Sequence, residues 1–178
     1  MPTYVALLRG VNVGGNTLKM DRLRAVCAEL GLKNVRTYVQ SGNMVFAAQK
    51  SASHWARVLE RSLVGESRLT VSVMVRSAAD MARVVAGNPF VDEKGIDHAR
   101  LAVTFLDRVP AKSALHALAA LPSVPDRFVH AGAEIYLHCP GGFAATKLTN
   151  NAFEKLLSVR ATSRNWNTVN RLHAMCAE

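Results

Sequence analysis

The feature that most constrains the fold is a strand-like segment near the start of the chain, residues 3–9. Its middle residues, Tyr4 to Leu8, are all apolar and do not alternate with polar residues. This pattern is typical of a strand that is buried on both faces. We therefore expect this segment to lie inside a sheet, with other strands pairing on both of its edges.

The segments that follow predict the rest of the first unit. Met20, Leu23, Cys27 and Leu30 form an apolar stripe that predicts a helix over about 20–30. Strands are predicted over 35–40 and 43–47, a helix from Ser51 or Ser53 to Gly65, and a half-buried strand over 69–76. This βαββαβ order is typical of a ferredoxin-like antiparallel sandwich, with sheet order 4-1-3-2 and both helices on one face.

A second unit is predicted after a break at Asn88-Pro89. A third helix precedes the break, begins after Ser77 and has Asp80 placed to complete a capping box. We expect domains over 1–87 and 88–178, the second being a smaller βαββα unit. Its elements are a strand over 101–106, a helix over 112–121, a hairpin of 126–130 with 134–139, and a helix over 151–157. A short strand over 161–165 and a last helix over 168–175 complete this α+β chain.

Charge and composition restrict the partners. The formal net charge is +9, and residues 1–50 carry seven basic and two acidic residues. A basic surface attracts anions, although many proteins are basic for solubility alone. No apolar run approaches the length of a membrane span, and the first residues do not resemble a signal peptide. We therefore expect a cytoplasmic protein with no membrane partner.

Metal and disulfide chemistry are not indicated. Cys27, Cys139 and Cys176 are odd in number and far apart, which argues against a disulfide framework. Cys27 lies on an apolar helical stripe and Cys139 in a predicted strand, so both are expected to be buried, inert thiols. The histidines show no metal-ligand spacing, and no cofactor motif is present.

A candidate anion site follows from the direction of the strands. In the predicted sheet the first two strands run the same way, so the loop after the first and the turn after the second leave the sheet at one end. Glycine-rich loops at helix N-termini are suited to anions. The residues expected at this end are Arg9, Asn12, Gly14, Gly15, Lys19, Gln40 and Asn43. The spacing matches neither a P-loop nor a dinucleotide fingerprint, and the glycines can equally serve only the chain geometry.

A second pair of candidates lies near the end of the chain. Arg164 and Trp166 can form a cation with an aromatic platform for a base or sugar. Alternatively, Trp166 packs in the core while Asn167 or Thr168 caps the last helix. The sequence does not decide between these two interpretations, nor whether Arg164 joins the site at Arg9.

Three ordered motifs identify a family resemblance. They are residues 9–15 (RGVNVGG), residues 38–43 (YVQSGN) and residues 161–169 (ATSRNWNTV). Together they resemble the domain of unknown function 1697 family, over essentially the whole chain. The pattern Thr-x-Arg-Asn-Trp-x-Thr matches at Thr162, Arg164, Asn165, Trp166 and Thr168. The resemblance implies a small bacterial α+β protein and implies no activity.

Three functions are compatible with these residues. The favoured hypothesis is a binding module for a phosphate-bearing ligand, a nucleotide or RNA, although residues 43–47 lack the aromatic pattern of an RNA-recognition motif. The second is an acylphosphatase-like hydrolase in which Arg9 holds phosphate and Asn43 orients water, which is an analogy of fold alone. The third is a protein–protein adaptor. Whether the chain is an enzyme is left open by the sequence.

Overall fold

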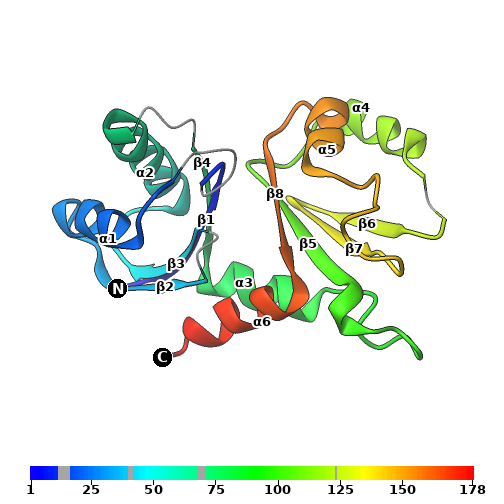
Figure 1. The fold of residues 1–178 in the computed structure, drawn as a ribbon, viewed down its shortest axis with the longest axis horizontal. Helices are drawn as coiled ribbons and strands as arrows, with labels where there is room; N and C mark the ends of the chain where they lie inside the picture. Colours follow the sequence, from blue (N-terminus) through cyan, green and yellow to red (C-terminus); the bar gives the residue numbers. More distant parts are fainter. Residues whose placement is uncertain (12–16, 40–41, 68–70, 123) are drawn as a thin grey trace. The chain divides into compact units, whose positions relative to one another are not determined.

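The computed structural model describes residues 1–11, 17–39, 42–67, 71–122 and 124–178. These residues form two compact units, one of Met1–Arg83 with Leu172–Glu178 and one of Val84–Arg171. Each unit contains a four-stranded antiparallel sheet, and the described ranges hold six α-helices (Figure 1). The protein is therefore of mixed α+β class, as the sequence predicts.

The first unit follows the predicted order of elements. They are β1 (Thr3–Arg9), α1 (Met20–Glu29), β2 (Lys33–Tyr38), β3 (Asn43–Ala47), α2 (Ala52–Ser67), β4 (Ser72–Ser77) and the start of α3 (Ala78–Ala86). The sheet order is β2-β3-β1-β4, so β1 is a central strand paired with β3 and β4. The apolar run at the start of the chain thus correctly predicts an inner strand.

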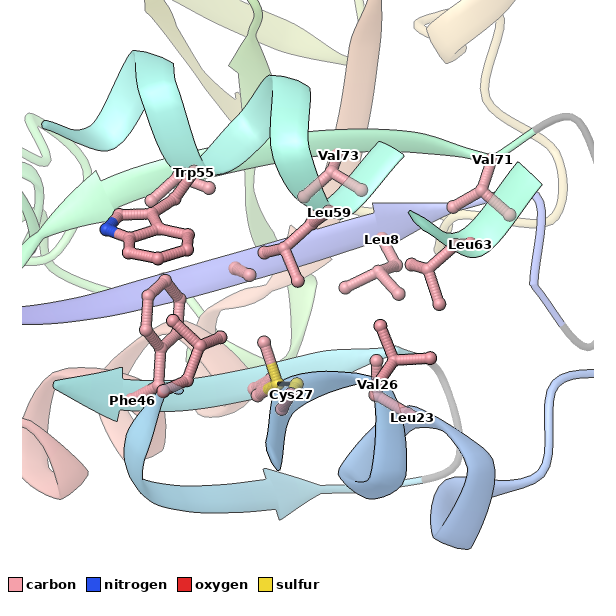
Figure 2. Packing of buried hydrophobic residues seen from close by; sticks show 14 of the residues in the cluster. Leu8, Leu23, Val26, Cys27, Phe46, Trp55, Leu59, Leu63, Val71 and Val73 are labelled. Carbon is pink, nitrogen blue, oxygen red and sulfur yellow. Dashed lines mark hydrogen bonds between the residues drawn. The ribbon is translucent and has the colours of Figure 1, made fainter. Parts of the chain in front are cut away.

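The core of the first unit lies between its sheet and the helices α1 and α2. Figure 2 shows side chains of both helices meeting residues of the sheet, with Trp55 and Leu59 of α2 above Phe46 of β3. The rings of Phe46 and Trp55 pack edge to face, with 6.2 Å between the ring centroids. Cys27 of α1 is fully buried there, and burial raises the pKa of its thiol to about 12.

Two predictions for the first unit are wrong in detail. Helix α2 does not end at Gly65 but continues to Ser67, because a single glycine costs a helix only about 1 kcal/mol and buried residues such as Leu59 and Leu63 hold it in place. Strand β4 is not half-buried, because Met74 and Arg76 on its second face are buried as well. The capping box of α3 is confirmed, since Asp80 accepts hydrogen bonds from the backbone and hydroxyl of Ser77.

The second unit follows its predicted βαββα order and adds the short strand predicted over 161–165. Its elements are η1 (His98–Arg100), β5 (Leu101–Leu106), α4 (Lys112–Leu115) with η2 (His116–Ala120), β6 (Arg127–Ala131), β7 (Glu134–His138), α5 (Asn150–Leu157), β8 (Ala161–Asn165) and most of α6 (Trp166–Met175). The short terminal strand pairs with β5, so the sheet order is β6-β7-β5-β8. Both units therefore share one strand order, which the dissimilar residues of the two halves conceal.

Equivalent hydrogen bonds confirm that the two units repeat one design. The amide of Leu8 donates to the Gly42 carbonyl over 2.8 Å, and the amide of Leu106 donates to the Ala133 carbonyl over the same distance. Both bonds join the last part of a central strand to the residue just before the strand that pairs with it, β3 or β7. The shared geometry places residue 8 in correspondence with residue 106.

A second equivalence involves the outer edges of the sheets. Glu60 of α2 accepts the amide of Val73 in β4, and Glu154 of α5 accepts the amide of Ala161 in β8, each over 2.8 Å. Both strands lie at a sheet edge, where amides without partners invite unwanted pairing. A helix glutamate therefore satisfies an edge amide in each unit.

The unit boundaries differ from the predicted division at residue 88. The boundary falls within α3 after Arg83, and the last residues of the chain belong to the first unit. Arg36 of β2 accounts for the second difference, because its guanidinium donates to the carbonyl of Met175 and forms an ion pair with Glu178. A cation at the end of α6 is also favoured by the helix dipole.

A candidate anion site at the end of the first strand

Arg9 is the last residue of β1 and marks the predicted end of the sheet. Residues Tyr4, Ala6 and Leu8 belong to the core beneath the helices, and side chains alternate along a strand. Arg9 therefore lies on the opposite face of the sheet, where Ser72 of β4 is its partner in register. Partial burial lowers the pKa of its guanidinium.

The flanks of the two predicted loops lie side by side at this end. Leu8 donates its amide to the Gly42 carbonyl, and a Cβ placed on Gly42 would lie 2.6 Å from Cγ2 of Val11. Gly42 has a φ of +76°, so glycine suits both the backbone and the space. Asn12, Gly14, Gly15 and Gln40 lie outside the described residues.

Lys19 stands where the glycine-rich loop meets α1. It occupies the N-cap position, is exposed, and makes no capping hydrogen bond with its side chain. Its carbonyl accepts the amide of Leu23. The described start of α1 therefore combines an exposed cation with the positive end of a helix dipole.

Asn43 lies on the same face of the sheet as Arg9. It is opposite Leu7 in register. Leu7 and Arg9 are two residues apart in β1, so their side chains lie on the same face of the sheet. Asn43 is fully buried, and its amide nitrogen donates to the Tyr38 carbonyl over 3.0 Å. This bond closes the turn between β2 and β3, so at least one donor of the side chain serves the fold.

Arg164 and Trp166 belong to the second unit, whereas Arg9 belongs to the first. The guanidinium of Arg164 donates to the Thr162 hydroxyl and to the Ser163 carbonyl, each over 2.9 Å. Burial lowers the pKa of Arg164 to about 10. Trp166 is 4% exposed, which leaves no open ring face on which a base can stack.

The cap of the last helix differs from both predicted residues. Helix α6 begins at Trp166, so neither Asn167 nor Thr168 precedes it. Instead, Asn165 accepts the amide of Thr168 with its side-chain oxygen, over 2.8 Å. An N-cap asparagine commonly accepts, with its side-chain oxygen, the backbone amide of the residue three positions later. The signal was present at Asn165, one residue before the tryptophan.

The position of the second unit that corresponds to Arg9 holds a residue of opposite charge. The residue after Leu106 is Asp107, and its carboxylate accepts both the backbone and the side-chain nitrogens of Arg160. Arg108 pairs with the same carboxylate over 2.9 Å. Sequence reasoning missed this contrast because it depends on the alignment of the two sheets, which only the hydrogen-bond register supplies.

Other features of the described residues set limits on the site. A cavity of about 360 Å³ in the first unit lies at the other end of β1, beside Thr3, Arg36 and Cys176. Within the described ranges, no three His, Cys, Asp or Glu side chains are grouped as a metal would require. No described helix combines the length and apolar character needed to cross a membrane.

Comparison with known proteins gives a family and a fold. No curated protein matches the chain. A solved structure, that of the conserved bacterial protein SP0830 from Streptococcus pneumoniae, is similar with a TM-score of 0.75 and 22% identity, over 98% of each chain. At this identity the likeness supports the fold alone. The family model described as protein of unknown function (DUF1697) matches residues 1–136, and the chain therefore belongs to this family.

Proposed function

We propose that the first unit binds a phosphate-bearing ligand, a nucleotide or RNA, at the end of β1. The observation that carries the proposal is the contact of Leu8 and Val11 with Gly42. It brings the flanks of the glycine-rich loop and of the turn after β2 together beside Arg9. An anion held there meets two stretches of backbone and a fixed cation.

The chemistry of the described residues suits an oxyanion. A guanidinium offers paired donors in a plane that matches two oxygens of a phosphate. The first amides of a helix lack partners within the helix and favour negative charge. Arg9 and the start of α1 at Lys19 provide these two elements.

The second unit supplies an internal contrast that supports this assignment. It repeats the sheet order, but its equivalent position is Asp107, which is already bonded to Arg108 and Arg160. A phosphate at this position would have to compete with the Asp107 carboxylate for these two arginines. The proposal therefore concerns the first unit, where Arg9 replaces the carboxylate and a longer connection separates the strand from its helix.

Replacing Arg9 tests the proposal directly. We expect Arg9→Ala to weaken binding of a phosphorylated ligand by roughly 1.5–3 kcal/mol, the scale of a hydrogen bond to a charged group. Lys50→Ala is the matched control, because Lys50 is exposed and lies at the opposite end of the sheet, where the amide of Ala48 bonds to Pro2. It removes the same charge and should leave binding unchanged.

Native mass spectrometry of the purified full chain, followed by a thermal-shift panel of phosphorylated compounds, identifies the ligand to titrate. The proposal is wrong if Arg9→Ala binds that ligand as tightly as the wild type. It is also wrong if Lys50→Ala weakens binding equally, because the effect is then one of net charge.

Salt dependence separates the two ligand classes. An RNA contacts the protein through several phosphates, so its affinity falls steeply as salt rises. A mononucleotide releases few counterions and shows a shallow dependence. Titrating a short oligonucleotide and a mononucleotide over the same range of salt concentrations distinguishes them.

We also propose that both units are ferredoxin-like sandwiches. The support is their βαββαβ order and the position of the first strand of each unit between its third and fourth strands. The acylphosphatase-like alternative gains no support from Asn43, whose amide nitrogen is bonded within its own turn.

A further inference from the structure

A cavity of about 340 Å³ lies in the second unit, between β8, the start of α5 and the loop before it. Its apolar wall is formed by Ala102, Leu137, Phe143 and Leu148. Phe143 is 38% exposed at this cavity, although a large aromatic side chain is costly to leave in water. The wall is thus suited to an apolar body of modest size.

The polar lining of the cavity presents donors. Asn165 uses its side-chain oxygen to accept the amide of Thr168, which leaves its NH₂ group as the unused part of the side chain. Asn150 likewise uses its oxygen to accept the hydroxyl of Ser163. Among the described residues, neither of these two amide nitrogens has a hydrogen-bond partner in the chain.

The neighbouring hydroxyls are already committed. The Ser163 hydroxyl donates to Asn150 and lies 2.7 Å from the hydroxyl oxygen of Thr104. It therefore acts as a donor to one neighbour and as an acceptor from the other. Thr146 donates to Asp126 over 2.6 Å and accepts the amide of Leu148. The side-chain groups left to meet a ligand are therefore dominated by the two amide NH₂ groups.

The two asparagines line the same cavity. Ser163 and Asn165 alternate on one face of β8, about 7 Å apart along the strand, and Asn150 is hydrogen-bonded to Ser163. The described residues of the lining include Arg164 and no acidic residue. Two amide donors in a lining that has no carboxylate favour an acceptor with two oxygens.

We propose that this cavity binds a small carboxylate with an apolar body, whose two oxygens accept from Asn150 and Asn165. The inference does not depend on the proposed function of the first unit. A cation is disfavoured because the lining offers it no anionic partner, and a neutral amide has only one oxygen to accept both donors.

Benzoate is the probe, with benzamide and benzylamine as matched compounds of similar shape. Each is titrated into the full chain and followed by NMR of the side-chain amide signals. We expect saturable binding of benzoate that shifts the NH₂ signals of Asn150 and Asn165, weaker binding of benzamide, and the weakest binding of benzylamine. Equal binding of either matched compound, or no binding of benzoate, overturns the proposal.

Asn165→Asp replaces the NH₂ donor by a charged oxygen and keeps an oxygen to cap α6. We expect it to weaken benzoate binding by roughly tenfold or more. Asn150→Asp makes the same change at the other donor and keeps the acceptor for Ser163. Asn151→Asp is the control. This substitution adds the same charge in the first turn of α5, but Asn151 does not line the cavity.

Thermal unfolding of each variant verifies that the chain is folded, and Asn150→Asp decides the matter if Asn165→Asp unfolds. The proposal fails if both cavity variants bind benzoate within twofold of the wild type, or if Asn151→Asp weakens binding as much as they do. Arg9→Ala should leave benzoate binding unchanged, so this test and that of the first unit fail separately.

Discussion

Gly42 is the position where a single methyl group tests the junction of the two loop flanks. In Gly42→Ala the new Cβ would lie 2.6 Å from Cγ2 of Val11 and 2.8 Å from Cβ of Leu8. The Val11 methyl can move, but Leu8 belongs to the central strand β1 and cannot. The substitution therefore strains the frame that positions the proposed site.

Two costs contribute to the expected loss of stability. A residue with a Cβ at φ +76° pays roughly 1–2 kcal/mol for the left-handed backbone. Forcing a methyl group into a packed site costs about 1–3 kcal/mol more. Gly31→Ala isolates the first cost, because Gly31 has a φ of +72° and no atom within 4 Å of the added Cβ. The difference between the two variants should be about 1–3 kcal/mol.

Urea unfolding followed by tryptophan fluorescence measures this difference. The chain has two tryptophans, and Trp55 lies in the core of the first unit. With Trp166→Phe in every variant, the signal reports that unit. If Gly42→Ala is no less stable than Gly31→Ala, Gly42 is not packed against Leu8, and the two loop flanks do not meet there.

Three further predictions concern stability and reactivity. Cys27 should react with a thiol reagent far more slowly than Cys176, because Cys27 is fully buried and burial raises the pKa of its thiol to about 12; reagent uptake by the folded chain, resolved by peptide mass spectrometry, measures both. Burial raises the pKa of Asp80, but hydrogen bonds from Ser77 and the neighbouring Arg83 outweigh it and lower the pKa overall. The resulting stability should be complete above the unfolded pKa of about 4 and be lost as pH falls through the folded pKa, whereas Asp80→Asn should show less of this acid sensitivity in unfolding curves. Glu60→Ala should cost about 1–3 kcal/mol in urea unfolding, because it leaves an edge-strand amide without its acceptor.

The sequence predicts the first unit well where hydrophobic periodicity and turn residues agree. The apolar run Tyr4–Leu8 gives a central strand, and Ser77 with Asp80 gives a capped helix start. Both depend on residues within one element. The position of Gly42 beside Leu8 also follows from topology, because strand direction alone brings the two loop flanks to one end of the sheet.

Predictions fail where pairing over long distances decides the outcome. The strand over 161–165 is predicted, but its pairing with β5, which makes it the fourth strand of the second sheet, is not. Asn150 and Asn165 line one cavity although they lie in different elements. No local pattern records such a shared lining, so neither asparagine was a candidate from the sequence.

The alternation of apolar and polar residues in β4 predicts a half-buried strand, and the second unit explains why this prediction is wrong. Arg76 lies opposite Val5, and Arg164 lies opposite Val103, so the two arginines occupy the same position in their sheets. Arg76 is 8% exposed, and burial lowers the pKa of Arg164. A buried guanidinium is tolerated only when its donors are satisfied, and Arg164 donates within its own strand. An arginine in an alternating pattern thus identifies a polar side chain on that face and does not establish that the face is open to water. Both sheets have an arginine at this position, so this arginine belongs to the fold that the two units share. The position equivalent to Arg9 in the second unit is instead an aspartate, so Arg9 distinguishes the first unit.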